Sequence, residues 1–217
     1  MMKKGKRSKE ILSKIDRSRY YPVDEAVNLL KETHKTKFDE SVEVSLNLGV
    51  DPKHADQMVR GTVSLPHGTG KQVRVLVINR GEKDDEAKES GADYVGFQEY
   101  LQKIKDGWFE FDVLVATPDS MSEIGKLGKL LGTRGLMPNP KSGTVTQDIG
   151  KTVKEIKAGR IDFRVDKYGI LHSAVGKVSF AADQIIENVL SFVTTVQRLK
   201  PASAKGLYLK KITLSST

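Results

Sequence analysis

Hydrophobic and polar residues alternate along residues 41–48 (SVEVSLNL) with the period of a β-strand. Val42, Val44, Leu46 and Leu48 fall on one side of such a strand, and polar residues fall on the other. The pattern therefore predicts a strand that has one face in a core and one face in water.

The middle of the chain follows a different pattern, in which apolar runs of strand length alternate with helical spacing. Residues 72–79 and 111–118 are β-branched runs bounded by turn residues, and they predict buried strands. The same reading predicts a short strand at 93–97 and helices at 82–90, 98–105, 121–131 and 149–158. This alternation predicts a three-layer α/β unit, Rossmann-like, with a mainly parallel sheet.

The remaining segments favour antiparallel structure. Residues 161–165 and 170–175 flank the turn-forming tetrapeptide Asp-Lys-Tyr-Gly, and we expect them to form a hairpin. Apolar periodicity predicts a helix at about 23–32 and a longer helix capped by Ser179. A last strand is expected at 208–216.

The two ends of the chain are predicted to form one domain, because neither end has enough strands for a sheet by itself. We expect a discontinuous α+β domain with an antiparallel sheet, made of residues 1–67 and 159–217, and an inserted α/β domain of residues 68–158. The fold class as a whole is α/β. The two connections carry residues that suit a hinge: Pro66, Gly68, Gly70 and Gly159.

The charge of the chain is divided unevenly between these predicted domains. The formal net charge is +8. Residues 1–67 contribute +3 and residues 159–217 contribute +5, whereas residues 68–158 carry 14 Lys and Arg against 14 Asp and Glu. A polyanionic partner is therefore expected to bind the discontinuous domain.

Composition excludes several classes of site. The chain has no cysteine, so disulfides, thiolate metal sites and cysteine nucleophiles are absent. The four histidines show no ligand spacing, and we expect no metal and no cofactor. There is no apolar stretch of bilayer length, and the Lys-rich start lacks the apolar region of a signal peptide. We expect a cytoplasmic chain without a membrane partner.

An enzyme is not expected either. Residues 67–72 (HGTGKQ) superficially resemble a phosphate-binding loop, but Leu65 and Gln72 occupy the places of its first glycine and its hydroxyl residue. The turn after the first buried strand, at 79–82, has one glycine where a dinucleotide site uses three. No nucleophile elbow accompanies the Ser, His and Asp residues. The alternative is a small-ligand or nucleotide-binding enzyme that uses the inserted domain.

Two places in the discontinuous domain suit RNA. Phe38 follows Lys37 at the start of the alternating strand, where it could pack on a ribose or base, or else on its own loop. Lys211 precedes a set of alternating hydroxyl residues in the last strand: Thr213, Ser215 and Thr217. Hydroxyls beside a cation suit phosphate and 2′-hydroxyl contacts, although a solvated strand would have the same composition.

Residues 128–146 (GKLLGTRGLMPNPKSGTVT) combine four glycines, two prolines and three cations, which no ordinary helix, strand or turn requires. This segment resembles the signature of the ribosomal protein L1 family. Further segments resemble the bacterial form of the family: 37–43 (KFDESVE), 60–68 (RGTVSLPHG), 91–96 (GADYVG), 158–161 (AGRI) and 215–217 (SST). The resemblance covers essentially the whole chain.

The resemblance implies a two-domain, non-enzymatic protein of the mobile stalk of the large ribosomal subunit. Its terminal domain would bind large-subunit ribosomal RNA directly, and the protein would be a monomer off the ribosome. It also implies assistance to the release of exit-site tRNA, and repression of translation by binding the mRNA of its own operon. Family members continue after Ser-Ser-Thr with Met-Gly-Pro, which does not follow Thr217 in this sequence.

Carried over by position, the resemblance implies a set of RNA-binding residues: Lys37, Phe38, Ser41, Glu43, Lys167, Gly169, His172, Lys211, Ser215, Ser216 and Thr217. Lys211 stands where the family has a hydroxyl. In the signature segment, Arg134 and Lys141 are candidates for a secondary contact to tRNA. A carboxylate such as that of Glu43 would accept hydrogen bonds from a 2′-hydroxyl or a base amine.

Overall fold

The computed structural model describes residues 5, 10–11, 13–16, 18–81 and 83–217. Contacts between Cα atoms divide the chain into two compact units, residues 1–58 with 165–217 and residues 59–164. We call them the terminal unit and the middle unit. The middle unit extends beyond the predicted insert at both ends, and the predicted boundary at 67/68 and 158/159 stays a prediction.

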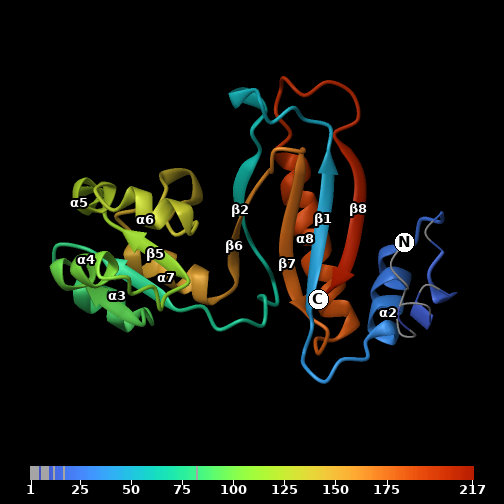
Figure 1. Ribbon diagram of the computed structural model, residues 1–217, viewed down its shortest axis with the longest axis horizontal. Helices are drawn as coiled ribbons and strands as arrows, with labels where there is room; N and C mark the ends of the chain where they lie inside the picture. The colour runs from blue at the N-terminus through green and yellow to red at the C-terminus, as the bar shows by residue number, and fades with distance from the viewer. Residues whose placement is uncertain (1–4, 6–9, 12, 17, 82) are drawn as a thin grey trace. The chain divides into compact units, whose positions relative to one another are not determined.

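The terminal unit contains a three-stranded antiparallel sheet of order β7-β1-β8. β1 (Ser41–Leu48) is central, and β7 (Ile170–Lys177) and β8 (Leu209–Ser216) flank it (Figure 1). The predicted alternation is confirmed, because the four apolar residues of β1 are at most 2% exposed. Residues of β1 at even positions face the core, and those at odd positions face the other side of the sheet.

One long helix covers the apolar face of this sheet. α8 (Ala182–Arg198) lies behind the strands in Figure 1 and directs the buried Ile185, Val189, Phe192 and Val196 into the core. The shorter α2 (Val23–Thr33) contacts α8 and β8. The opposite face of the sheet is therefore left open within this unit, among the residues that the structure describes.

The predicted cap of this helix is wrong. α8 begins after Ala181, whose backbone N–H donates to the side chain of Gln184 at 3.0 Å. Ser179 instead donates its backbone N–H and its hydroxyl to Asp39, at 3.0 and 2.7 Å. Ser179 therefore binds Asp39, which is distant in sequence, instead of capping the helix as the local sequence pattern predicts.

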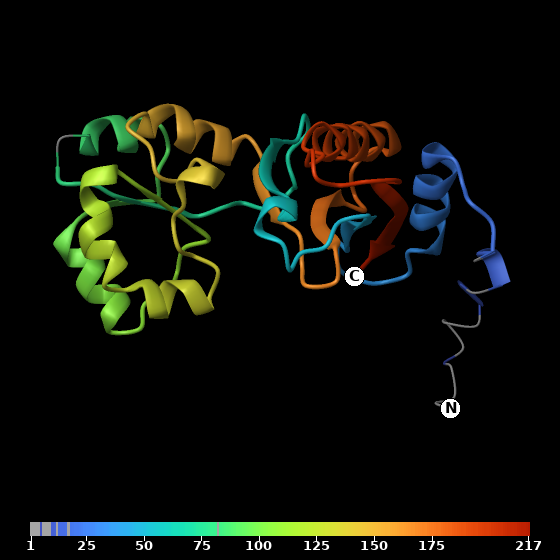
Figure 2. The same cartoon turned by 90° about the horizontal axis from the view of Figure 1, so that it is seen from above.

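The middle unit has three layers, as predicted. Its parallel sheet has the order β4-β3-β5, from β3 (Val75–Ile78), β4 (Tyr94–Gly96) and β5 (Val113–Ala116). The helices are α3 (Asp84–Glu89), α4 (Gln98–Lys105), α5 (Met121–Gly125), α6 (Gly128–Thr133) and α7 (Ile149–Lys157). α3 and α7 pack on one face, and α4, α5 and α6 pack on the other (Figure 2). The fold class is therefore confirmed as α/β.

A two-stranded antiparallel ribbon in the middle unit was not predicted. β2 (Arg60–Ser64) pairs with β6 (Arg160–Arg164), and β6 does not pair with β7. The predicted hairpin is therefore wrong, although the turn at 166–169 does form. A turn sequence specifies a local bend, but the pairing partner is chosen by non-local packing. β2 has only Gly61 and Val63 on its buried side, which is a weak strand signal.

The four predicted hinge residues lie inside the middle unit. The backbone N–H of Leu65 donates to the carbonyl of Gly159 at 3.3 Å, so the two connections touch there. Gly68, Gly70 and Gly159 all have positive φ, at 64°, 72° and 104°. Their role as a hinge stays a prediction.

Among the described residues, no helix combines the length and apolar character that a bilayer crossing demands. No group of three or more His, Asp and Glu side chains in the described part of the chain is arranged to hold a metal ion.

Asp93 stabilises the start of β3. Its carboxylate accepts from the Val75 N–H at 2.7 Å and from Lys157 Nζ at 2.6 Å. Burial opposes ionisation, but these hydrogen bonds outweigh it and hold the pKa of Asp93 below the ordinary 3.8. A lowered pKa contributes stability that is present above pH 4 and is lost as pH falls through the folded-state pKa.

We expect Asp93→Asn to lower the free energy of unfolding at pH 7, by no more than about 1 kcal/mol because the pair is partly solvated. The side chains of Asp93 and Lys157 are 35% and 32% exposed. Urea titration followed by fluorescence of the single tryptophan, Trp108, would report on the middle unit. The difference from wild type should shrink at pH 3; a difference that grows there would contradict this account.

Candidate nucleic-acid interface

The open side of the β7-β1-β8 sheet carries five of the eleven predicted RNA-binding residues: Ser41, Glu43, His172, Lys211 and Ser215. Residues directly opposite each other in antiparallel strands share a face. Ser45 of β1 lies opposite His172 and Thr213, and Glu43 lies opposite Ser215. We call the following set the polar sheet face: Ser41, Glu43, Ser45, Asn47, His172, Lys177, Lys211, Thr213 and Ser215.

Hydrogen bonds connect the strands across this face. Ser45 Oγ is 3.0 Å from His172 Nδ1, and Lys177 Nζ donates to Ser41 Oγ at 2.8 Å. Lys177 was missed by sequence reasoning, because its place opposite Ser41 follows only from the strand register. The face thus presents hydroxyls, a carboxylate, an imidazole and ammonium groups to solvent. These are the groups that contact phosphates and 2′-hydroxyls in RNA complexes.

Phe38 lies in the loop that leads into β1, and its side chain is exposed. It is 58% exposed, so it does not pack into its own loop. The carboxylate of Asp39 accepts both hydrogen bonds from Ser179, chiefly the hydroxyl one, and this holds the pKa of Asp39 below its ordinary value. Next to it, the fully buried Glu40 is 3.3 Å from His34 Nδ1. The loop is thus anchored by the two residues that follow the exposed aromatic ring.

The last residues of the chain lie beside the start of β1. Both the N–H and the hydroxyl of Thr217 donate to the carbonyl of Ser41, at 3.2 and 3.4 Å. Ser215 is on the polar sheet face, but Ser216 pairs with Val42 and points to the opposite side. Thr217 is therefore placed near Ser41, whereas Ser216 is not brought to this face.

Lys167 and Gly169 lie at the other end of the sheet from Phe38. They belong to the turn before β7, and the Gly169 carbonyl accepts from the N–H of Leu48, the last residue of β1. An eight-residue strand spans about 26 Å at about 3.3 Å per residue. The predicted RNA-binding residues thus form two groups at the ends of the sheet, joined by the polar sheet face.

The signature segment belongs to the middle unit. Its residues 144–146 lie alongside β5, where the Thr144 carbonyl accepts from Ala116 N–H and Thr146 N–H donates to the Ala116 carbonyl, at 2.9 and 3.0 Å. The Arg134 guanidinium lies 4.0 Å from the centre of the Phe109 ring. Arg134 and Lys141 are exposed. The structure places neither of them on the polar sheet face.

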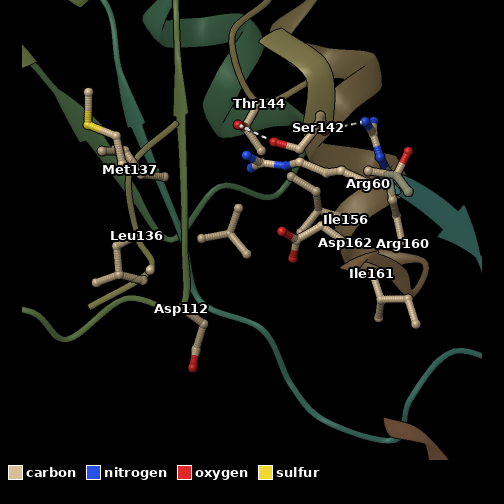
Figure 3. Close-up of a pocket in the computed structure, with 14 residues that line it drawn as sticks. Arg60, Asp112, Leu136, Met137, Ser142, Thr144, Ile156, Arg160, Ile161 and Asp162 are labelled. Carbon is tan, nitrogen blue, oxygen red and sulfur yellow. Dashed lines mark hydrogen bonds between the residues drawn. The ribbon is translucent and has the colours of Figure 1, made fainter. Parts of the chain in front are cut away.

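A pocket in the middle unit lies between this segment and the β2-β6 ribbon (Figure 3). Arg160 lines it, but its guanidinium already donates to Glu155 at 2.8 Å and to the Ser142 carbonyl at 2.6 Å. A Cβ on Gly143 would lie 2.3 Å from Arg160 Nη2. This signature glycine therefore makes room for an internal contact, which explains one part of the motif by packing.

The two units also differ in charge. The terminal unit has 19 Lys and Arg against 13 Asp and Glu, and the middle unit has 17 against 15. Most of the positive excess of the chain thus lies in the unit that carries the polar sheet face. An anionic polymer is attracted more strongly to this unit.

Lysine and hydroxyl side chains are the groups that contact phosphate and sugar in nucleic-acid complexes, so the polar sheet face has the composition of a nucleic-acid-binding surface. The model of a family described as "Ribosomal protein L1p/L10e family" matches residues 30–217. This chain belongs to that family.

Relatives resemble the chain over nearly its whole length. It is 58% identical over 213 residues to "Large ribosomal subunit protein uL1" of Chlorobium chlorochromatii, which covers 98% of this chain and 93% of the relative. It is 57% identical over 217 residues to the protein of the same name from Porphyromonas gingivalis, covering 100% and 94%. The predicted resemblance is confirmed. Since this is a family of ribosomal proteins, the prediction that the chain is not an enzyme is confirmed by membership.

Proposed function

We propose that this chain is a structural constituent of the large ribosomal subunit, in the cytoplasm, and that it binds large-subunit ribosomal RNA directly to form the mobile stalk. The observation that supports this most is the polar sheet face, which lies in the more basic unit and carries five of the residues implied by the family resemblance, with others in the loops at its two ends. The large-subunit relatives favour the same reading.

Affinity and specificity would come from different groups. Lys37, Lys177 and Lys211 would neutralise phosphates, which would supply salt-dependent affinity. Glu43 repels phosphates and can only accept hydrogen bonds, so it selects a 2′-hydroxyl or base amine at one position. Phe38 offers an exposed ring to a ribose or base. Such a surface reads the shape of a folded RNA rather than a linear sequence.

The proposal extends to two further RNAs. The same surface would bind a site in the mRNA of its own operon that mimics the ribosomal one, and so repress translation. The stalk would also assist release of exit-site tRNA, with Arg134 and Lys141 as a secondary contact. The chain would act as a monomer off the ribosome.

Removing the predicted insert tests which part binds RNA. We expect a chain that lacks residues 68–158, with its flanks joined, to keep most of the affinity for large-subunit RNA and nearly the same salt dependence. The deleted segment has no net charge, so few phosphate contacts should be lost. Filter binding at several salt concentrations measures both quantities. Binding of the RNA by residues 68–158 alone, and not by the joined flanks, would contradict the proposal.

Two alternative functions would each give a different experimental result. A nucleotide-binding enzyme in the middle unit would show a rise in melting temperature with a nucleotide, which a thermal-shift screen detects. A general RNA chaperone would bind unrelated RNAs with equal affinity. Protection of one large-subunit RNA region from hydroxyl radicals, together with co-sedimentation with the large subunit, is the result that we expect instead.

A further inference from the structure

Three loops meet at the end of the terminal sheet opposite to Phe38. They are the segment after β1, the turn before β7 and the segment before β8. Gly49 N–H donates to the Tyr208 carbonyl at 2.6 Å, and Leu48 N–H donates to the Gly169 carbonyl at 2.9 Å. The backbone after β1 is thus held between the other two loops.

Two glycines allow this close approach. A Cβ on Gly49 would lie 2.1 Å from the Leu207 carbonyl oxygen. A Cβ on Gly169, where φ is +80°, would lie 3.2 Å from the Val50 carbonyl oxygen. The carboxylate of Asp166 also accepts from the N–H groups of Tyr168 and Ile170, at 2.8 and 2.9 Å. The loop cluster is therefore held by backbone contacts and does not need a ligand to order it.

This cluster exposes large side chains that a core would normally bury. Tyr168 is 72% exposed and Leu207 is 71% exposed. Lys167 Nζ lies 5.0 Å from the centre of the Tyr168 ring, which leaves most of the ring in solvent. Exposed aromatic rings beside cations are used to stack unpaired bases.

The charge around Tyr168 and Leu207 suits an anionic polymer. The three loops and the first residues of β8 carry exposed lysines: Lys53, Lys167, Lys205, Lys210 and Lys211. Two carboxylates of these loops accept local hydrogen bonds: Asp51 accepts from Lys53 N–H at 3.0 Å, and Asp166 accepts from its own turn. Phosphates that flank a base on Tyr168 would therefore meet lysines.

We propose that Tyr168 stacks an unpaired base of the same ribosomal RNA that covers the polar sheet face, with Leu207 beside it and Lys205 on a flanking phosphate. This rests on the proposed function. We choose the same ribosomal RNA as the ligand because the loop cluster is continuous with the polar sheet face. Asn47 and Lys211 form the row of that face that lies next to the cluster. A single RNA that lies along the sheet would reach both Phe38 and Tyr168.

The test compares full-length variants on the large-subunit RNA fragment that the wild-type chain protects. We expect Tyr168→Ala to raise Kd about 5- to 100-fold and Tyr168→Phe to stay within about twofold of wild type, since a stacked ring needs no hydroxyl. Tyr168→Ala should leave the slope of log Kd against log salt unchanged, whereas Lys205→Gln should reduce it by about one. If Tyr168 had only a structural role, its loss would not change Kd while leaving the salt dependence unchanged.

Tyr20→Ala is the matched control, because Tyr20 is 83% exposed and lies in the segment before α2. If Tyr168→Ala binds like wild type and like Tyr20→Ala, while Phe38→Ala is weaker, the inference is overturned and the proposed function stands. If Tyr168→Ala weakens only tRNA binding, the choice of RNA is overturned. If the wild-type chain protects no ribosomal RNA, the proposed function fails and the inference fails with it.

Discussion

Phe38→Ala should weaken specific binding to large-subunit RNA by about 1–3 kcal/mol, which is the scale of a lost base or ribose contact with an aromatic ring. The ring is 58% exposed, so its removal leaves no cavity in the core. The loop itself is held by Asp39 and Glu40 rather than by the ring. A filter-binding titration at fixed salt measures the loss.

Two controls separate a lost contact from a lost fold. Phe38→Tyr keeps the ring and should bind within a few-fold of wild type. The melting temperature of Phe38→Ala should match that of wild type, because few packing contacts are removed. Unchanged RNA affinity in Phe38→Ala would show that the ring does not meet RNA.

Gly159→Ala should lower the free energy of unfolding of the middle unit by about 3 kcal/mol or more. The added Cβ would lie 2.3 Å from Gly68 Cα, which is backbone and cannot rotate away. The residue also has φ of +104°, which strains any side chain. Both costs apply in the folded state alone, so unfolding relieves them.

Trp108 makes this measurable, because it is the single tryptophan and packs against Tyr94 and Phe111 in the middle unit. Urea unfolding followed by its fluorescence should move to lower urea in Gly159→Ala. Gly132→Ala is the matched control. Gly132 lies in α6, and an added Cβ would meet no atom within 4 Å apart from its chain neighbours and its own helix backbone. Alanine should therefore be neutral or stabilise by up to about 1 kcal/mol. Equal midpoints for the two variants would refute the steric argument.

Elements with strong periodicity could be predicted closely. The strand at 41–48 and the helix at 98–105 have the same bounds in the structure, because a period of two or of 3.6 is set by burial of one face. The predicted helix at 121–131 is two short helices, α5 and α6. The β2-β6 ribbon was missed because Gly61 weakens its pattern.

The sequence predicted many of the residues of the candidate interface, but it did not predict how they are arranged on the sheet. Phe38, Ser41, Glu43 and Thr217 were assigned through the family resemblance, and their geometry keeps them near one end of β1. Lys177 could not be found, since only the register of β7 puts it opposite Ser41. The register of β8 puts Ser216 opposite Val42, on the side of the sheet away from the polar sheet face.

The sequence by itself determined the α/β class, the family and the uneven division of charge, because periodicity, motif order and composition are properties of the chain. The tertiary structure decided which side of the central sheet stays open and which side chains meet there, because strand order and register depend on contacts distant in sequence. It also decided that Ser179 holds the Phe38 loop rather than a helix, and that Tyr168 and Leu207 share one exposed end of the sheet.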